Sequence, residues 1–136
     1  MDLTLTDEQE LIRDSVARLL AKHSGPEQVR EAEAAGFDPV LWDALVAMGL
    51  PAMTLPGSVD GGDSTLTDLG VALEECGAAL ATAPVVEAAV AGRALAAAGD
   101  DAHARAVASG AVVVASPRAG GRLVPGAVGM GRAPRP

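Results

Sequence analysis

The sequence is poor in cysteine and in aromatic residues, and each scarcity excludes a class of protein. Cys76 is the only cysteine among 136 residues, so neither an intrachain disulfide nor a cysteine-rich zinc site can form. Aromatic residues make up 1% of the chain, whereas a β-sandwich core needs aromatic and β-branched strands. The composition therefore favours closely packed helices with an alanine-rich core.

Basic residues and long apolar runs are also scarce, which excludes two kinds of partner. Ten basic residues accompany 18 acidic ones, for a formal net charge of −8, so we expect no binding to nucleic acid. No apolar run reaches the roughly 18 residues that a membrane span requires. The N-terminus, Met1-Asp2-Leu3-Thr4, does not resemble a signal peptide. We expect a cytoplasmic domain that does not contact membranes.

Helix signals recur along the first 109 residues. Thr6 and Gln9 form a capping box, and the apolar stripe that follows predicts a helix ended by Gly25 and Pro26. Further helices are expected over 27–35, 39–48, from Ser64 or Thr67 to about 76, 84–99 and 101–109. Trp42 is expected to flank the core, and the inward residues of the first four helices are expected to be Leu11, Ile12, Val16, Leu19, Leu20, Val40, Leu41, Leu45, Met48, Leu66, Leu69, Leu73 and Cys76.

Composition and charge change near residue 110. Residues 111–116 (AVVVAS) predict a short strand, and glycine, arginine and proline dominate after Pro117. Through Asp101 the chain has 18 acids and five bases, whereas from Ala102 onward it has five arginines and no acid. We therefore predict an all-α, orthogonal bundle of five to six helices over 1–110, then the start of a further β-domain with an irregular tail over 111–136.

Few residues here could carry out catalysis. His23 and His103 lie on different predicted helices without neighbouring ligands, so we interpret them as surface residues. We interpret Cys76 as a small buried hydrophobic residue. The loop 57–63 lacks the ending of a phosphate-binding P-loop and the alternating acids of a calcium loop, which favours a flexible connector between helices.

The acidic residues give one candidate of interest. Glu74 and Glu75 are adjacent on a predicted helix and point in different directions, which favours a solvated face. Glu87 lies one turn into an otherwise apolar helix. Two interpretations of Glu87 stay open: a charge stabilised by the helix dipole, and a carboxylate facing a pocket.

The order of several motifs resembles the N-terminal part of acyl-CoA dehydrogenases. The similarity runs from about Leu3 to about Val114. No single motif is specific, but their order and spacing match the family. The motifs are 5–14 (LTDEQELIRD), 36–42 (GFDPVLW), 48–50 (MGL), 55–56 (LP) with Gly61-Gly62, 73–77 (LEECG) and 97–100 (AAGD).

This resemblance implies the all-helical N-terminal domain of a three-domain flavoenzyme. The implied reaction is FAD-dependent removal of two hydrogens from the α and β carbons of an acyl-CoA thioester. In the family this domain helps to wall the acyl pocket. Matching the family's pocket helix places Glu87 at the closed end of that pocket, with Pro84, Val90 and Ala91 nearby. The family's catalytic glutamate lies further along the chain, so no catalytic residue is assigned here.

One departure from the family concerns the cofactor. The stretch that contacts the flavin usually reads TEPGAGS, whereas residues 115–121 read ASPRAGG and lack the hydroxyl donors at both ends. We therefore do not expect this chain to bind FAD or to be active by itself. The alternative is a helical accessory module that docks on a full-length dehydrogenase subunit. A homo-oligomer is also compatible with the resemblance.

Overall fold

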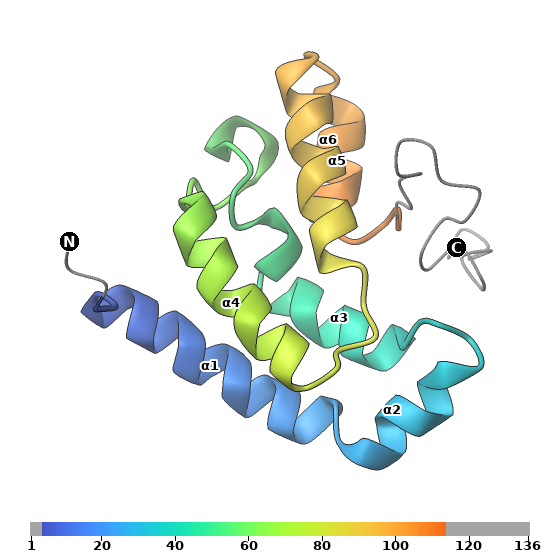
Figure 1. Cartoon of the computed structure of the whole chain (residues 1–136). Coiled ribbons are helices and arrows are strands. Elements are labelled where there is room, and N and C mark those ends of the chain that lie inside the picture. The colour runs from blue at the N-terminus through green and yellow to red at the C-terminus, as the bar shows by residue number, and fades with distance from the viewer. Residues whose placement is uncertain (1–3, 114–136) are drawn as a thin grey trace, which may run out of the picture.

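The computed structural model describes residues 4–113, and all regular structure in this range is helical (Figure 1). This confirms the all-α fold predicted from the alanine-rich composition. Among these residues no helix is long and apolar enough to cross a membrane. The α-helices are α1 (Asp7–His23), α2 (Pro26–Glu33), α3 (Pro39–Ala47), α4 (Leu66–Ala78), α5 (Val85–Ala97) and α6 (Asp101–Ala108), and the connection from α3 to α4 contains the 3₁₀ turns η1 (Leu50–Ala52) and η2 (Gly57–Val59).

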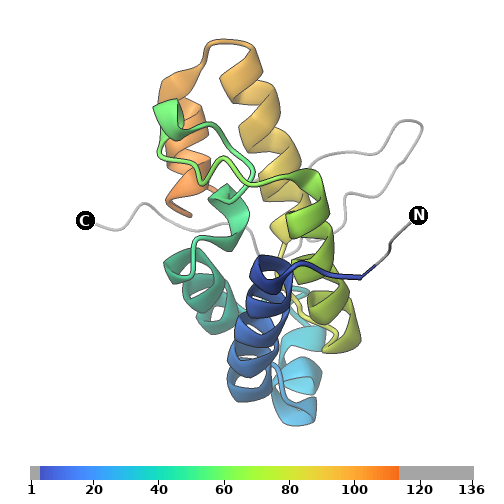
Figure 2. The same cartoon turned by 90° about the vertical axis from the view of Figure 1, so that its left-hand side faces the viewer.

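α1 and α4 pack side by side, and polar contacts hold both ends of the pair (Figures 1 and 2). The predicted capping box of α1 is present: Gln9 N donates to Thr6 Oγ1 at 3.2 Å, and Thr6 N donates to Gln9 Oε1 at 3.1 Å. The same Gln9 side chain donates from Nε2 to Asp68 Oδ1 in the first turn of α4, at 3.0 Å. After the C-terminal end of α1, Ser24 Oγ donates to Ala79 O at 3.1 Å. The two helices therefore run in the same direction.

The N-cap of α4 differs from the prediction. Neither Ser64 nor Thr67 caps the helix; Thr65 does, because Asp68 three residues later completes a second capping box. Asp68 N donates to Thr65 Oγ1 at 3.2 Å, and Asp68 Oδ2 accepts from Thr65 N at 2.9 Å. The hydrogen bonds from the Thr65 side chain and from Gln9 lower the pKa of Asp68. The interlocked caps thus favour the ionised form of this carboxylate.

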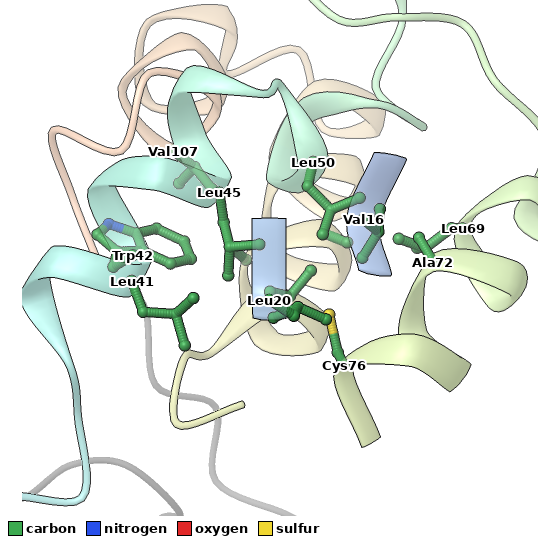
Figure 3. Close-up of a cluster of buried hydrophobic side chains, with 13 residues drawn as sticks. Val16, Leu20, Leu41, Trp42, Leu45, Leu50, Leu69, Ala72, Cys76 and Val107 are labelled. Carbon is green, nitrogen blue, oxygen red and sulfur yellow. The ribbon is translucent and has the colours of Figure 1, made fainter. Parts of the chain in front are cut away.

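The main hydrophobic core lies where α1, α3, α4 and α5 meet (Figure 3). The side chains of Leu20 and Cys76 lie close together between α1 and α4. Trp42, which was expected only to flank the core, is completely buried in it. The members of this cluster are Val16, Leu20, Leu41, Trp42, Leu45, Leu50, Leu69, Ala72, Cys76, Val85, Ala88, Ala89 and Val107.

Several residues that were expected to be inward are exposed instead. Leu11 is 64% exposed because it lies about 140° around the helix from Val16, at 100° per residue. Val40 is 65% exposed because it likewise lies about 140° around α3 from the buried Leu45. Two residues at helix ends are also exposed, Leu66 at the start of α4 and Met48 just after α3. Where a helix has apolar residues on more than one face, residue type alone does not show which of them face the core.

The connection from α3 to α4 packs against the rest of the domain, although its glycines predicted a flexible loop. Gly61 N donates to Pro56 O at 3.0 Å, and Gly62 N donates to Ala52 O at 3.1 Å. A Cβ atom on Gly61 would lie 2.0 Å from Leu55 O, so the backbones approach too closely for any side chain. The glycines therefore serve close packing.

α5 and α6 form a pair that packs on η1, with η2 against α6 (Figure 2). Gly99, with φ +78°, allows the tight turn between them. Of the predicted strand over 111–116, the structure describes only 111–113, and these residues form no strand. Val112 N instead donates to Ala106 O of α6 at 3.2 Å. The rest of the predicted strand and tail lies outside the described residues.

The core assignment predicts a large loss of stability for Leu45→Ala. Leu45 is completely buried, so its truncation leaves a cavity and should lower the free energy of unfolding by about 2–5 kcal/mol. Leu11→Ala is the matched control, and we expect a change within about 0.5 kcal/mol. Urea unfolding measures both; equal effects of the two substitutions would contradict the core assignment.

The packing of the connection predicts opposite effects for two glycine substitutions. Gly61→Ala should destabilise the domain by about 1–3 kcal/mol, because its Cβ meets the Leu55 backbone. Gly70→Ala lies on the exposed face of α4 with nothing within 4 Å of the new Cβ, and should stabilise by about 0.5–1 kcal/mol. Thermal unfolding distinguishes them, and a neutral Gly61→Ala would show that this connection is not closely packed.

Candidate functional site

The residues predicted to face substrate lie on the first half of α5. Pro84 is buried and immediately precedes the helix, which has no side-chain N-cap. Glu87 is half-buried in the first turn, where the helix dipole stabilises a negative charge. Val90 is 57% exposed, and Ala91 is half-buried. The four residues therefore follow one helix from its buried start onto its outer surface.

A cavity of about 350 Å³ lies beside Glu87, between the end of α4 and the start of α5. Glu87 and Cys76, from different helices, both line it, whereas Pro84, Val90 and Ala91 do not. Among the described residues the Glu87 carboxylate makes no hydrogen bond or ion pair. The remaining lining residues are apolar: Leu73, Gly77, Leu80, Ala81, Ala83, Val85 and Val86. The site is thus an apolar hollow with a single carboxylate.

Cys76 lines the cavity, and its burial confirms the interpretation of Cys76 as a small buried hydrophobic residue. It is 8% exposed, and burial raises the pKa of its thiol to about 11, with a further contribution from the Glu75 carboxylate. A thiol with this pKa is protonated at neutral pH and is a poor nucleophile. Cys76 therefore contributes apolar wall to the cavity.

The cavity opens onto an apolar surface. Leu80 is 68% exposed and Val86 is 50% exposed, and both also line the cavity. Val90 continues this surface one turn further along α5. We call these three residues the outer α5 surface. Contiguous exposed apolar residues of this kind are typical of a surface that another domain or subunit covers.

The other candidates do not form a site. His103 is exposed and lies 2.8 Å from Asp100 Oδ2 through its Nδ1 atom, so it stabilises the start of α6. Glu74 is exposed and Glu75 is half-buried. No group of three metal-ligating side chains occurs within 4–113. The described residues therefore form an all-helical domain with an apolar hollow beside Glu87.

Comparison with known proteins identifies the family. Residues 6–112 match the family model described as acyl-CoA dehydrogenase, N-terminal domain. The match covers most of the chain, and the chain belongs to this family. The resemblance predicted from the motifs at 5–14 and 73–77 is confirmed.

Similar proteins carry acyl-CoA dehydrogenase names. The chain is 40% identical over 85 residues to acyl-CoA dehydrogenase IpdE2 of Mycolicibacterium smegmatis, covering 60% of this chain and 27% of that protein. It is 36% identical over 75 residues to benzylmalonyl-CoA dehydrogenase of Aromatoleum aromaticum, covering 55% of this chain and 20% of that protein. A solved structure of a Tcur3481-Tcur3483 steroid ACAD variant superposes with a TM-score of 0.72 at 27% identity, covering 80% of this chain and 32% of that one. The chain thus spans about a third or less of each relative.

The burial of Cys76 predicts slow alkylation in the folded protein. At pH 8 a thiol of pKa about 11 has about a hundredfold less thiolate than one of ordinary pKa near 9, and access is restricted as well. We expect iodoacetamide to react at least about a hundredfold more slowly with the native chain than with the chain in urea. Because the chain has one cysteine, mass spectrometry of the intact protein measures the rate at this site alone. Equal rates would contradict the assignment of Cys76 to the core.

Proposed function

We propose that this chain is the N-terminal domain of a cytoplasmic, FAD-dependent acyl-CoA dehydrogenase. The parent reaction removes two hydrogens from the α and β carbons of an acyl-CoA thioester. The observation that carries the proposal is the family match over residues 6–112. The apolar hollow and the outer α5 surface support it, since a domain that walls an acyl pocket needs an apolar face directed at its neighbours.

In this proposal the start of α5 forms part of the wall of the acyl pocket. Pro84 fixes the start of the helix, and Val90 and Ala91, which do not line the hollow beside Glu87, continue the wall along α5. Glu87 places one carboxylate at the closed end of the pocket, where it limits what an apolar acyl group can occupy without desolvating a charge. None of these residues takes part in proton or hydride transfer.

The residues of this chain that the structure describes do not fit FAD by themselves. A buried flavin needs several converging hydrogen-bond donors. Two buried side-chain atoms within 4–113 are without a partner, Trp42 Nε1 and Thr54 Oγ1, and they lie on different segments. The segment 115–121, where the family contacts the flavin, lies outside the described residues. We therefore derive no step through FAD and propose that the chain alone is inactive.

A second candidate function rests on the outer α5 surface. If a separate, full-length acyl-CoA dehydrogenase covers Leu80, Val86 and Val90, the chain is an accessory module of that enzyme. A second copy of this chain could cover the same surface. In each case the partner buries the same apolar face. The mass of the complex that forms therefore distinguishes a full-length dehydrogenase from a second copy of this chain.

A chimaera tests the proposed function. The N-terminal domain of the M. smegmatis IpdE2 is replaced by residues 6–112 of this chain, and the purified chimaera is assayed for bound flavin and for dehydrogenation of a substrate of IpdE2. We expect both to be retained. Val90→Asp in the chimaera should lower activity at least about tenfold, because it buries an unpaired charge at the interface.

Leu11→Asp is the matched control, because Leu11 is 64% exposed, similar to Val90 at 57%, but lies on α1. We expect the control to keep the activity of the chimaera. A chimaera that folds but binds no flavin would contradict the proposal. If the unaltered chain instead co-elutes with complete IpdE2, the accessory function is favoured.

A further inference from the structure

A second cleft, of about 420 Å³, lies between the connection from α3 to α4 and the last turns of α5. It shares no lining residue with the cavity beside Glu87. Its polar lining residues are Thr54, Asp63, Ser64 and Arg93. Figure 1 shows the connection (green) beside α5. This cleft is therefore a separate feature that the proposed function does not use.

Arg93 provides a fixed positive charge in the cleft. Its Nη1 atom donates to Thr54 O at 2.9 Å, which holds the guanidinium across the cleft. Arg93 has no ion pair among the described residues, which is also true of Arg18 and Arg30, whereas Arg13 pairs with Asp14 at 3.1 Å. The remaining guanidinium donors are therefore available to a ligand in a planar fork that suits a carboxylate.

One further group in the cleft restricts the ligand. The Asp63 carboxylate accepts from Gly57 N through both oxygens at 3.1 Å. Its negative charge disfavours a dianion such as phosphate more than a singly charged carboxylate.

We propose that this cleft binds a carboxylate group, held by the Arg93 guanidinium, with the Ser64 hydroxyl as a neighbouring donor. The small side chains of Ala96 and Ala97 leave room for the apolar part of the ligand. The binding site is separate from the cavity beside Glu87 and does not depend on the proposed function, because all its groups belong to this chain.

A titration followed by NMR tests the proposal on the full chain. Sodium propionate and inorganic phosphate are added separately to ¹⁵N-labelled protein at constant ionic strength and pH. With propionate we expect saturable shifts of the amide signals of residues 54, 63–64, 93 and 96–97. Phosphate should give shifts that are weaker and that do not saturate over the same range.

Variants make the assignment specific to Arg93. Arg93→Gln should weaken propionate binding by about tenfold or more, since it removes a charge-assisted pair. The matched control is Arg30→Gln in α2, which also lines a surface hollow and should bind as the unaltered chain does. If Arg93→Gln does not fold, Ser64→Ala provides the second variant and should weaken binding less. Absence of saturable shifts with propionate, stronger binding of phosphate, or unchanged binding by a folded Arg93→Gln variant would overturn the proposal.

Discussion

The packing of α1 against α4 is the contact on which the rest of the domain depends. Gln9 belongs to the capping box of α1 and also donates to Asp68, which belongs to the capping box of α4. Ser24 and Ala79 tie the opposite ends. These polar contacts fix the relative position of the two helices, so that the apolar residues between them, Leu20 among them, meet in one arrangement. Burial of those residues supplies most of the stabilisation, and the caps select the register.

The second pair of helices is placed by small residues. Ala88, Ala89 and Gly92 form the buried face of α5, which therefore approaches the core closely. A Cβ on Gly92 would lie 2.8 Å from Leu55 Cδ2, so a larger residue would require the Leu55 side chain or the helix to shift. The buried face of α5 thus packs against other residues of this domain. Its apolar outer face, with Val86 and Val90, remains exposed on this chain, and exposed apolar residues of this kind are typical of a surface that a partner covers.

The sequence predicted the helices well because their ends carry local signals. Thr6 with Gln9 and Asp38 with Pro39 are caps whose pattern lies within four residues. Burial was harder to predict in Leu- and Val-rich helices, where Leu11 is indistinguishable from its neighbours by residue type. The cap at Thr65 also has a local signal, because Asp68 three residues later completes the T-x-x-D pattern of a capping box.

The candidate sites depend on contacts between distant segments. Glu87 was identified from the sequence by its apolar surroundings, but the cavity beside it forms only because the end of α4, with Cys76, lies against α5. Arg93 and Thr54 are 39 residues apart, and neither carries a local motif. The spacing of residues therefore predicts where a candidate site residue lies on its helix. It does not predict which distant residue lies beside it, because that contact depends on how the helices pack.

The central claim is that this domain supplies apolar wall and not a catalytic centre. The most direct measurement is the flavin absorbance and acyl-CoA dehydrogenase activity of the purified chain, with its mass determined by sedimentation equilibrium in the same sample. The account predicts a colourless protein without activity. A yellow, dehydrogenating monomer would contradict it.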